Sequence, residues 1–94
     1  MRKYELMFII RSDVEQEVVE ATVEKFANIV QKGGEIVKQD VIGKKRLAYE
    51  IEKHRDGIFV LFNFNAPAEV VAELDRVLKI TDEVIRHLIV KDVA

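Results

Sequence analysis

The sequence has no cysteine and no tryptophan, and only one proline and four glycines in 94 residues. Without cysteine it can form no disulfide, thiolate metal site or thiol nucleophile. The low glycine and proline content excludes collagen-like and low-complexity chains. The longest apolar runs, Leu6–Ile10 and Ile58–Phe62, are too short to cross a bilayer, and no signal-peptide pattern opens the chain. We therefore expect a soluble intracellular protein.

Charge of neither sign dominates. Fifteen Lys and Arg residues stand against 17 Asp and Glu, which gives a net charge of −2, and 49% of the residues are hydrophobic. This composition predicts one folded domain over residues 1–94. The overall field of such a protein does not attract a polyanion, so any contact with nucleic acid requires locally clustered cations.

Turn residues divide the chain into six elements. Residues 2–11 are apolar and rich in aromatic and β-branched types, which predicts a central strand. Apolar residues then recur every three or four positions from Val14 to Lys32. This spacing predicts an amphipathic helix, with Ser12 or Asp13 as its N-cap and Gly33-Gly34 at its end.

The second half of the chain is predicted to form two strands, a helix and a last strand. Residues 35–52 and 57–65 predict two antiparallel strands, with Asp56-Gly57 as the hairpin turn. A second amphipathic helix follows from near Pro67 to about Ile80, and residues 84–91 predict the last strand. The order strand, helix, strand, strand, helix, strand predicts an α+β, ferredoxin-like sandwich. In this fold a four-stranded antiparallel sheet carries both helices on one face.

The other face of this sheet carries a predicted apolar patch. If Ile58, Val60, Phe62 and Phe64 point toward the helices, the alternation of a strand places Phe59 on the open face. The same reasoning for the first and last strands predicts a patch of Met7, Ile9, Phe59, Leu61, Leu88 and Val90. Lys3 and Arg86 lie at its rim. Such a patch indicates a protein interface, or else a surface that a loop or a second copy of the chain covers.

Cations are concentrated in two places. Residues 43–55 hold five cations and two carboxylates, a local surplus of three positive charges: Lys44, Lys45, Arg46, Lys53 and Arg55. The first and last strands are predicted neighbours, which brings Arg2 and Lys3 near Lys91 and leaves Arg86 further along. These groups suit phosphate binding, and nearby Tyr4 and Tyr49 suit stacking on bases or ribose. Solubility of an edge strand and ordinary packing are the alternative explanations.

No catalytic, metal or cofactor site is expected. His54 and His87 are far apart in sequence, and neither has acidic neighbours at the spacing of metal ligands. Residues 15–24 carry four glutamates that are predicted to form a solvated helix face. Nothing around these glutamates predicts the desolvation that acid–base chemistry requires.

Three segments resemble a known family. MRKYELMFIIR, IGKKRLAYEIEKHRDGIF and LKITDEVIRHLIVKD are similar to the bacterial small-subunit ribosomal protein six family, in collinear order over essentially the whole chain. The resemblance implies a non-enzymatic RNA-binding protein of the cytoplasmic ribosome that supports subunit assembly and translation. It also implies binding to the central domain of 16S ribosomal RNA as a heterodimer with small-subunit ribosomal protein eighteen, a small basic protein.

The resemblance also assigns residues. It implies RNA contacts at Arg2, Lys3, Tyr4, Arg86 and Lys91, and at Lys44, Lys45, Arg46, Lys53 and Arg55 of the second cluster. The apolar patch of the open face is the predicted site for the protein partner. The alternative is a ferredoxin-like interaction or regulatory module that self-associates through that face.

Overall fold

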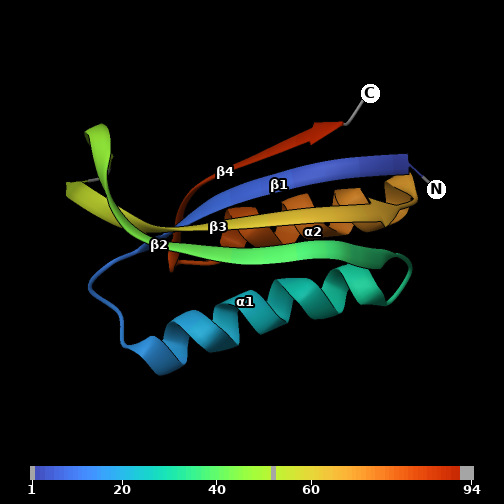
Figure 1. Cartoon of the computed structure of the whole chain (residues 1–94), viewed down its shortest axis with the longest axis horizontal. Helices are drawn as coiled ribbons and strands as arrows, with labels where there is room; N and C mark the ends of the chain where they lie inside the picture. The colour runs from blue at the N-terminus through green and yellow to red at the C-terminus, as the bar shows by residue number, and fades with distance from the viewer. Residues whose placement is uncertain (1, 52, 92–94) are drawn as a thin grey trace.

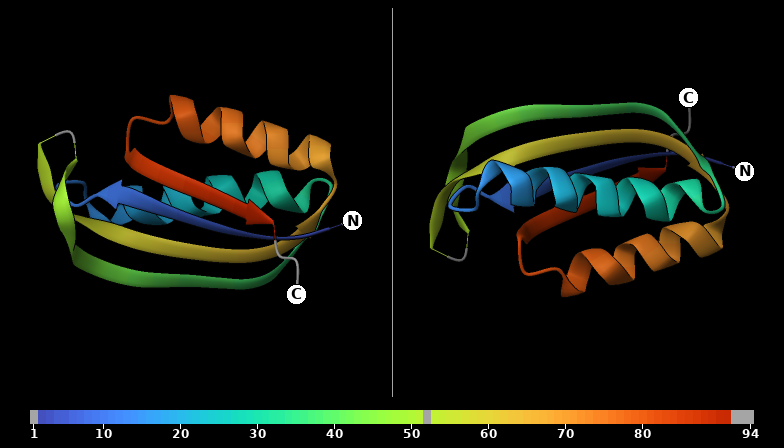
Figure 2. Two further views of the ribbon diagram at one scale, coloured as in Figure 1. Left: turned by 90° about the horizontal axis from the view of Figure 1, so that it is seen from above. Right: turned by 90° about the horizontal axis from the view of Figure 1, so that it is seen from below.

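A computed structural model describes residues 2–51 and 53–91. Its elements are β1 (Arg2–Arg11), α1 (Gln16–Gln31), β2 (Glu35–Ile51), β3 (His54–Ala66), α2 (Ala68–Ile80) and β4 (Val84–Lys91). The strands form one sheet in the order β2-β3-β1-β4, with every neighbouring pair antiparallel (Figure 1). Both helices cover the same face of this sheet (Figure 2). The predicted ferredoxin-like fold, with β1 inside the sheet, is therefore confirmed.

The main core lies between the sheet and the helices. At its centre Phe8 of β1 is fully buried and meets Phe26 of α1 and Phe62 of β3 edge to face, with ring centroids 5.1 and 5.6 Å apart. The predicted alternation of β3 is confirmed, because Val60, Phe62 and Phe64 are buried and Ile58 packs against the same core. The open face is therefore formed by the residues between them.

The predicted start of α1 is wrong. The helix begins at Gln16 after Glu15, which makes no side-chain capping hydrogen bond. Both predicted caps have other partners: Asp13 accepts two hydrogen bonds from the Arg11 guanidinium, at 2.7 and 2.8 Å, and the Ser12 hydroxyl donates to Asp56. These tertiary and local contacts replace the N-cap that the sequence predicts.

The predicted hairpin turn is also wrong. Asp56 and Gly57 lie within β3, where they pair with Arg46 and Lys45, and the hairpin closes between Ile51 and His54. Lys53 has a φ of +70° in this turn. Gly57 is needed for close packing instead, since a Cβ there would lie 2.3 Å from Cγ2 of Ile9. Residue 52, the predicted end of the second strand, lies outside the described residues.

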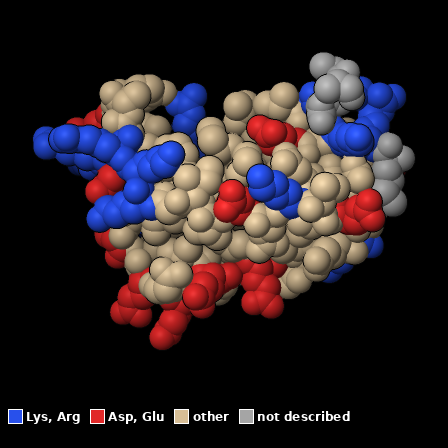
Figure 3. All heavy atoms as spheres, viewed as in Figure 1, with Lys and Arg blue, Asp and Glu red and all other residues tan. Residues whose placement is uncertain are grey.

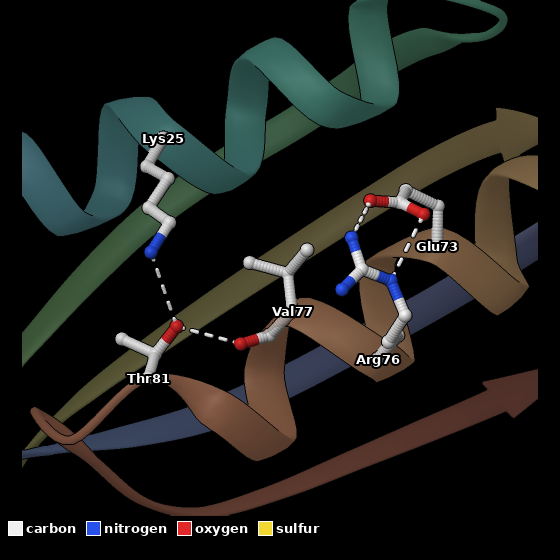
Figure 4. Close-up of polar contacts among 5 residues, drawn as sticks. All are labelled: Lys25, Glu73, Arg76, Val77 and Thr81. Carbon is white, nitrogen blue, oxygen red and sulfur yellow. Dashed lines mark hydrogen bonds and ion pairs between the residues drawn. The ribbon is translucent and has the colours of Figure 1, made fainter.

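A polar contact at the end of α2 joins the two helices (Figure 4). The buried hydroxyl of Thr81 donates to the carbonyl oxygen of Val77 at 2.6 Å and accepts from Lys25 Nζ of α1 at 3.3 Å. The Thr81 hydroxyl thereby pairs with one of the carbonyls that a helix end leaves without a partner.

Neither of the helices in the described ranges has the length and hydrophobicity that a membrane span requires.

Candidate nucleic-acid and protein interface

The β2–β3 hairpin carries one of the two predicted cation groups. β2 and β3 run beyond the ends of β1 and β4 and curl at their far end (Figure 1). The register shifts between Val41 and Gly43, and Gly43 has a φ of +112° that favours glycine. Bulges of this kind bend a strand and increase its twist. The bend turns the outer half of β2 toward the open face of the sheet.

The bent hairpin encloses part of the predicted apolar patch. A cavity of about 280 Å³ is lined by Met7, Ile9, Phe59 and Leu88 of the patch and by Leu47 and Ile51 of β2. Ile9 is 5% exposed although it lies on the face opposite the main core. The sequence predicted these four patch residues together, but it missed the β2 residues, because their position depends on the bend at Gly43.

Tyr49 and Arg86 form the rim of this cavity. The Arg86 guanidinium donates to the Tyr49 hydroxyl, and its central carbon lies 5.9 Å from the centroid of the tyrosine ring. Tyr49 belongs to β2 and Arg86 to β4, so this contact links the two edge strands across the open face. Arg86 retains further N–H donors for another ligand, since a guanidinium has five.

Beyond the cavity, two more patch residues extend the apolar surface. Leu61 of β3 pairs with Met7 of β1, and Met7 also pairs with Leu88 of β4. Val90 of β4 pairs with Glu5, which lies two residues before Met7 on the same face of β1. Leu88 and Val90 are 55% and 47% exposed. All six predicted patch residues therefore share one face, which continues outward from the cavity.

The ten predicted RNA-contact residues fall into two groups. Lys44, Lys45, Arg46, Lys53 and Arg55 lie on the hairpin, and Arg86 lies beside them across the open face. Arg2, Lys3, Tyr4 and Lys91 lie at the opposite end of the sheet, where Tyr4 pairs with Lys91. Figure 3 shows cations at both ends of the molecule and carboxylates along the edge that α1 occupies in Figure 1.

Ion pairs among the described residues involve few of these cations. In the ranges 2–51 and 53–91, Lys44 is the one member of the ten within ion-pair distance of a carboxylate, at 3.6 Å from Asp56 Oδ2. The Ser12 hydroxyl and then Lys44 hold the pKa of the Asp56 carboxyl below its usual value. The other cations of the two groups are exposed, so a polyanion can reach them.

The ring of Tyr4 is packed against the protein and is not free to stack on a nucleotide base. Its ring stacks on Phe64, with centroids 5.7 Å apart and an angle of 23° between the planes, and it packs against the main core. Alternation along β1 places Arg2 and Tyr4 on the helix side and Lys3 on the open side. Tyr4 also borders a groove with Lys91 and α2, so its exposed edge remains accessible at this end.

The two histidines lie in different environments. His87 faces the helices, and its Nε2 lies 2.9 Å from Asp75 of α2. Lys79 lies 2.8 Å from the second oxygen of Asp75, and these two contacts lower the pKa of the Asp75 carboxyl. His54 is half-buried on β3. Across the described part of the chain, no three histidine or acidic side chains are arranged to hold a metal ion.

Comparison with known proteins places this arrangement in a family. The family model of ribosomal protein S6 matches residues 3–91. The small ribosomal subunit protein bS6 of Desulforamulus reducens is 52% identical over 93 residues, covering 98% of both chains. That of Moorella thermoacetica is 49% identical over 92 residues, covering 97% of this chain and 94% of the relative.

A solved structure agrees with both the sequence match and the fold. The 30S ribosomal protein S6 of Thermotoga maritima superimposes with a TM-score of 0.92 at 32% identity, over 97% of this chain and 87% of that one. The agreement covers the sheet, both helices and nearly the whole length. The chain therefore belongs to the ribosomal protein S6 family, a family of small ribosomal subunit proteins.

Proposed function

We propose that this protein binds the central domain of 16S ribosomal RNA together with the basic small-subunit ribosomal protein eighteen. Its role is structural: it supports assembly of the small subunit and translation without catalysing a reaction. One observation carries the proposal. Two groups of exposed cations lie at opposite ends of a sheet whose open face carries an apolar patch between them. Family membership places the protein in the ribosome of the cytoplasm.

The charge distribution supports a joint rather than a solitary RNA contact. The net charge is −2, and exposed glutamates along α1 repel a polyanion from that side. Lys and Arg at the two ends of the sheet neutralise phosphates locally, but a protein with this overall charge binds RNA weakly alone. A basic partner on the adjacent apolar face adds both positive charge and contact area.

The open face supports docking of that partner. It presents the six patch residues on one surface, and apolar surfaces that are exposed in a monomer mark protein interfaces. Arg2, Lys3 and Lys91 at one end and the hairpin cations at the other end flank this surface. RNA that runs along the surface of the complex therefore contacts cations on both sides of the docked partner.

Binding of a central-domain 16S RNA fragment, measured at several salt concentrations, tests the proposal. The protein is assayed alone and with ribosomal protein eighteen. We expect tight binding only with both proteins, and an affinity that falls as salt rises. Arg2→Ala should weaken binding and reduce the salt slope by about one. The matched control is Arg76→Ala, because Arg76 pairs with Glu73 on α2, away from both groups.

The alternative function gives a different result. A self-associating module would bind no RNA in either mixture and would sediment as a homodimer that a charged substitution in the patch dissociates. Equal small effects of every Lys and Arg substitution, including Arg76→Ala, would remove the site assignment. Tight RNA binding by the protein alone would contradict the role of the partner.

A further inference from the structure

The cavity under the bent hairpin is built from all four strands of the sheet. Ile9 of β1 forms its floor, and its walls include Leu47 of β2, Phe59 of β3 and Leu88 of β4. The Ile9 side chain is 5% exposed, and a Cβ on the neighbouring Gly57 would lie only 2.3 Å from its Cγ2. Close packing therefore holds the floor in place, and the cavity is a fixed feature of the fold.

Two hydrogen-bond donors meet at the mouth of this cavity. The Arg86 guanidinium donates to the Tyr49 hydroxyl, and both side chains line the cavity. A guanidinium has five N–H groups, and a tyrosine hydroxyl that accepts one hydrogen bond keeps its own hydrogen to donate. None of the ion pairs among residues 2–51 and 53–91 includes Arg86. The mouth therefore offers a positive charge and free donors to a ligand.

The charge next to the cavity is positive. His87 contributes to the lining, but its Nε2 bonds Asp75 of α2, on the helix side of the sheet. Within the described ranges, no carboxylate lines the cavity. Glu50 borders an adjoining hollow, together with Arg46 and Arg55. An anionic group of a ligand is therefore attracted to the mouth, and a cationic group is repelled.

Carboxylates elsewhere on the open face do not alter this choice. Glu5 and Asp40 belong to that face but lie outside the cavity lining. Lys3 and Lys38 are exposed on the same face. These four charges balance, which leaves Arg86 as the group that selects the ligand.

The walls and the size of the cavity limit the body of the ligand. Because the walls are apolar, a sugar or a nucleobase would leave several buried polar groups without partners, which is costly. The volume of about 280 Å³ is close to the lower end of the range of about 300–1,000 Å³ that is typical of small-molecule sites. The cavity therefore suits a small hydrocarbon body, such as two fused rings.

We propose that this cavity binds a small apolar carboxylate, such as a bicyclic aromatic acid. The hydrocarbon body lies against Ile9, Leu47 and Leu88, and the carboxylate accepts hydrogen bonds from the Arg86 guanidinium and the Tyr49 hydroxyl. A planar carboxylate matches the fork of a guanidinium, so one acid group uses the free donors of the mouth. This inference goes beyond the proposed function and does not depend on it, because it concerns the free protein and a small molecule.

Methyl NMR of the free protein, titrated with three probes, tests the proposal. The probes are 2-naphthoate, its neutral isostere 2-naphthamide, and acetate, which has the charge without the apolar body. We expect 2-naphthoate to shift the methyl signals of Ile9, Leu47 and Leu88 and to saturate with a dissociation constant of about 0.1–1 mM, as suits a ligand of this size. The amide should bind about tenfold more weakly, and acetate should not shift these methyl groups.

A pair of arginine variants locates the anionic end of the ligand. Arg86→Gln should weaken 2-naphthoate binding about tenfold and leave 2-naphthamide binding unchanged. Arg76→Gln is the matched control, since Arg76 lies on α2 beside Glu73 and should bind 2-naphthoate normally. Thermal melting confirms that both variants fold.

The opposite results are equally clear. Absence of saturable shifts at the three methyl-bearing residues would overturn the site. Equal affinity for the acid and the amide, or for the acid in Arg86→Gln and the unmodified protein, would show that Arg86 does not select an anion. Equal weakening by Arg86→Gln and Arg76→Gln would mean general charge attraction rather than a built site. None of these results bears on RNA binding, which is measured separately.

Discussion

The hydroxyl of Ser12 donates a hydrogen bond to Oδ1 of Asp56, with 2.5 Å between the two oxygens. This contact joins the loop after β1 to the start of β3. Lys44 of β2 lies 3.6 Å from the other carboxylate oxygen of Asp56. Three segments thus meet at the base of the hairpin that carries the five cations. The orientation of these cations therefore depends on a contact between the loop after β1 and β3, in which Lys44 itself takes part.

Replacement of Ser12 by alanine should therefore loosen the hairpin while the core stays intact. The variant leaves one oxygen of Asp56 without its donor, so the hairpin opens more often. We expect amide hydrogens near Lys44 and Asp56 to exchange several-fold faster, while those of Phe8 and Phe62 keep their protection. Ser12→Thr retains the hydroxyl and is the control. Uniform acceleration across all strands would show global destabilisation instead.

The buried hydroxyl of Thr81 gives a second prediction. Thr81→Val preserves the shape of the side chain but removes the donor to Val77 and the acceptor for Lys25. The free energy of unfolding should fall by about 1–2 kcal/mol, because a carbonyl at the end of α2 loses its partner in a buried position. Urea denaturation measures this change. Thr81→Ser should stay close to the unmodified protein, and a stable valine variant would contradict the role of the hydroxyl.

The pH dependence of stability should include a contribution from Asp75. Hydrogen bonds from Lys79 and His87 lower its pKa from the ordinary value of 3.8. A carboxyl that is more acidic in the folded than in the unfolded state stabilises the fold above pH 3.8. This stability is lost as the pH falls through the lower, folded pKa.

The comparison with Asp75→Asn isolates this contribution. Urea denaturation of both proteins between about pH 7 and about pH 3 should show a stability difference in favour of aspartate at neutral pH. The difference should shrink as the solution becomes acidic. A difference that stayed constant over this range would mean that the charge of Asp75 is not what stabilises the contact between α2 and β4.

Gly57 provides a prediction about packing. A Cβ at this position would lie 2.3 Å from Cγ2 of Ile9 and 3.3 Å from the carbonyl oxygen of Ile10. Gly57→Ala should destabilise the protein by about 1–3 kcal/mol, the usual cost of forcing an extra methyl into a packed site. Adding Ile9→Leu, which removes the branch at Cβ, should recover part of this loss. Additive effects of the two changes would exclude direct contact as the cause.

The fold was predictable because local patterns and tertiary packing agree over most of the chain. Alternation in β3 identified Val60 and Phe62 as core residues, and helical spacing predicted α1, whose Phe26 is buried in the same core. The errors lie at positions where one residue type is compatible with two different local structures. Gly57 permits a turn, but it also permits close contact with Ile9, and only the three-dimensional arrangement decides between them.

The candidate site was predictable only in part, for a related reason. The alternation of side chains along a strand places Met7 and Leu61 on the open face regardless of how the hairpin bends. The position of Leu47 depends on the bend at Gly43, and the contact between Tyr49 and Arg86 depends on the same bend. Sequence patterns describe each strand separately, so they do not show that one part of the sheet folds over another.

The open face offers the most direct test of partner docking. Leu61→Glu places a charge in the middle of the apolar patch, between Met7 and Asp40. We expect the affinity for ribosomal protein eighteen to fall by about tenfold or more, because docking would bury a carboxylate without a partner of its own. Calorimetric titration measures this affinity. The stability of the free protein should change little, since Leu61 lies outside the main core. Ile80→Glu adds the same charge at the end of α2, on the face opposite the patch and on a side chain that is also 65% exposed, and should bind the partner normally. If both variants bound with the affinity of the unmodified protein, the docking surface would have to lie elsewhere. If both lost affinity equally, general repulsion rather than contact at Leu61 would be the cause.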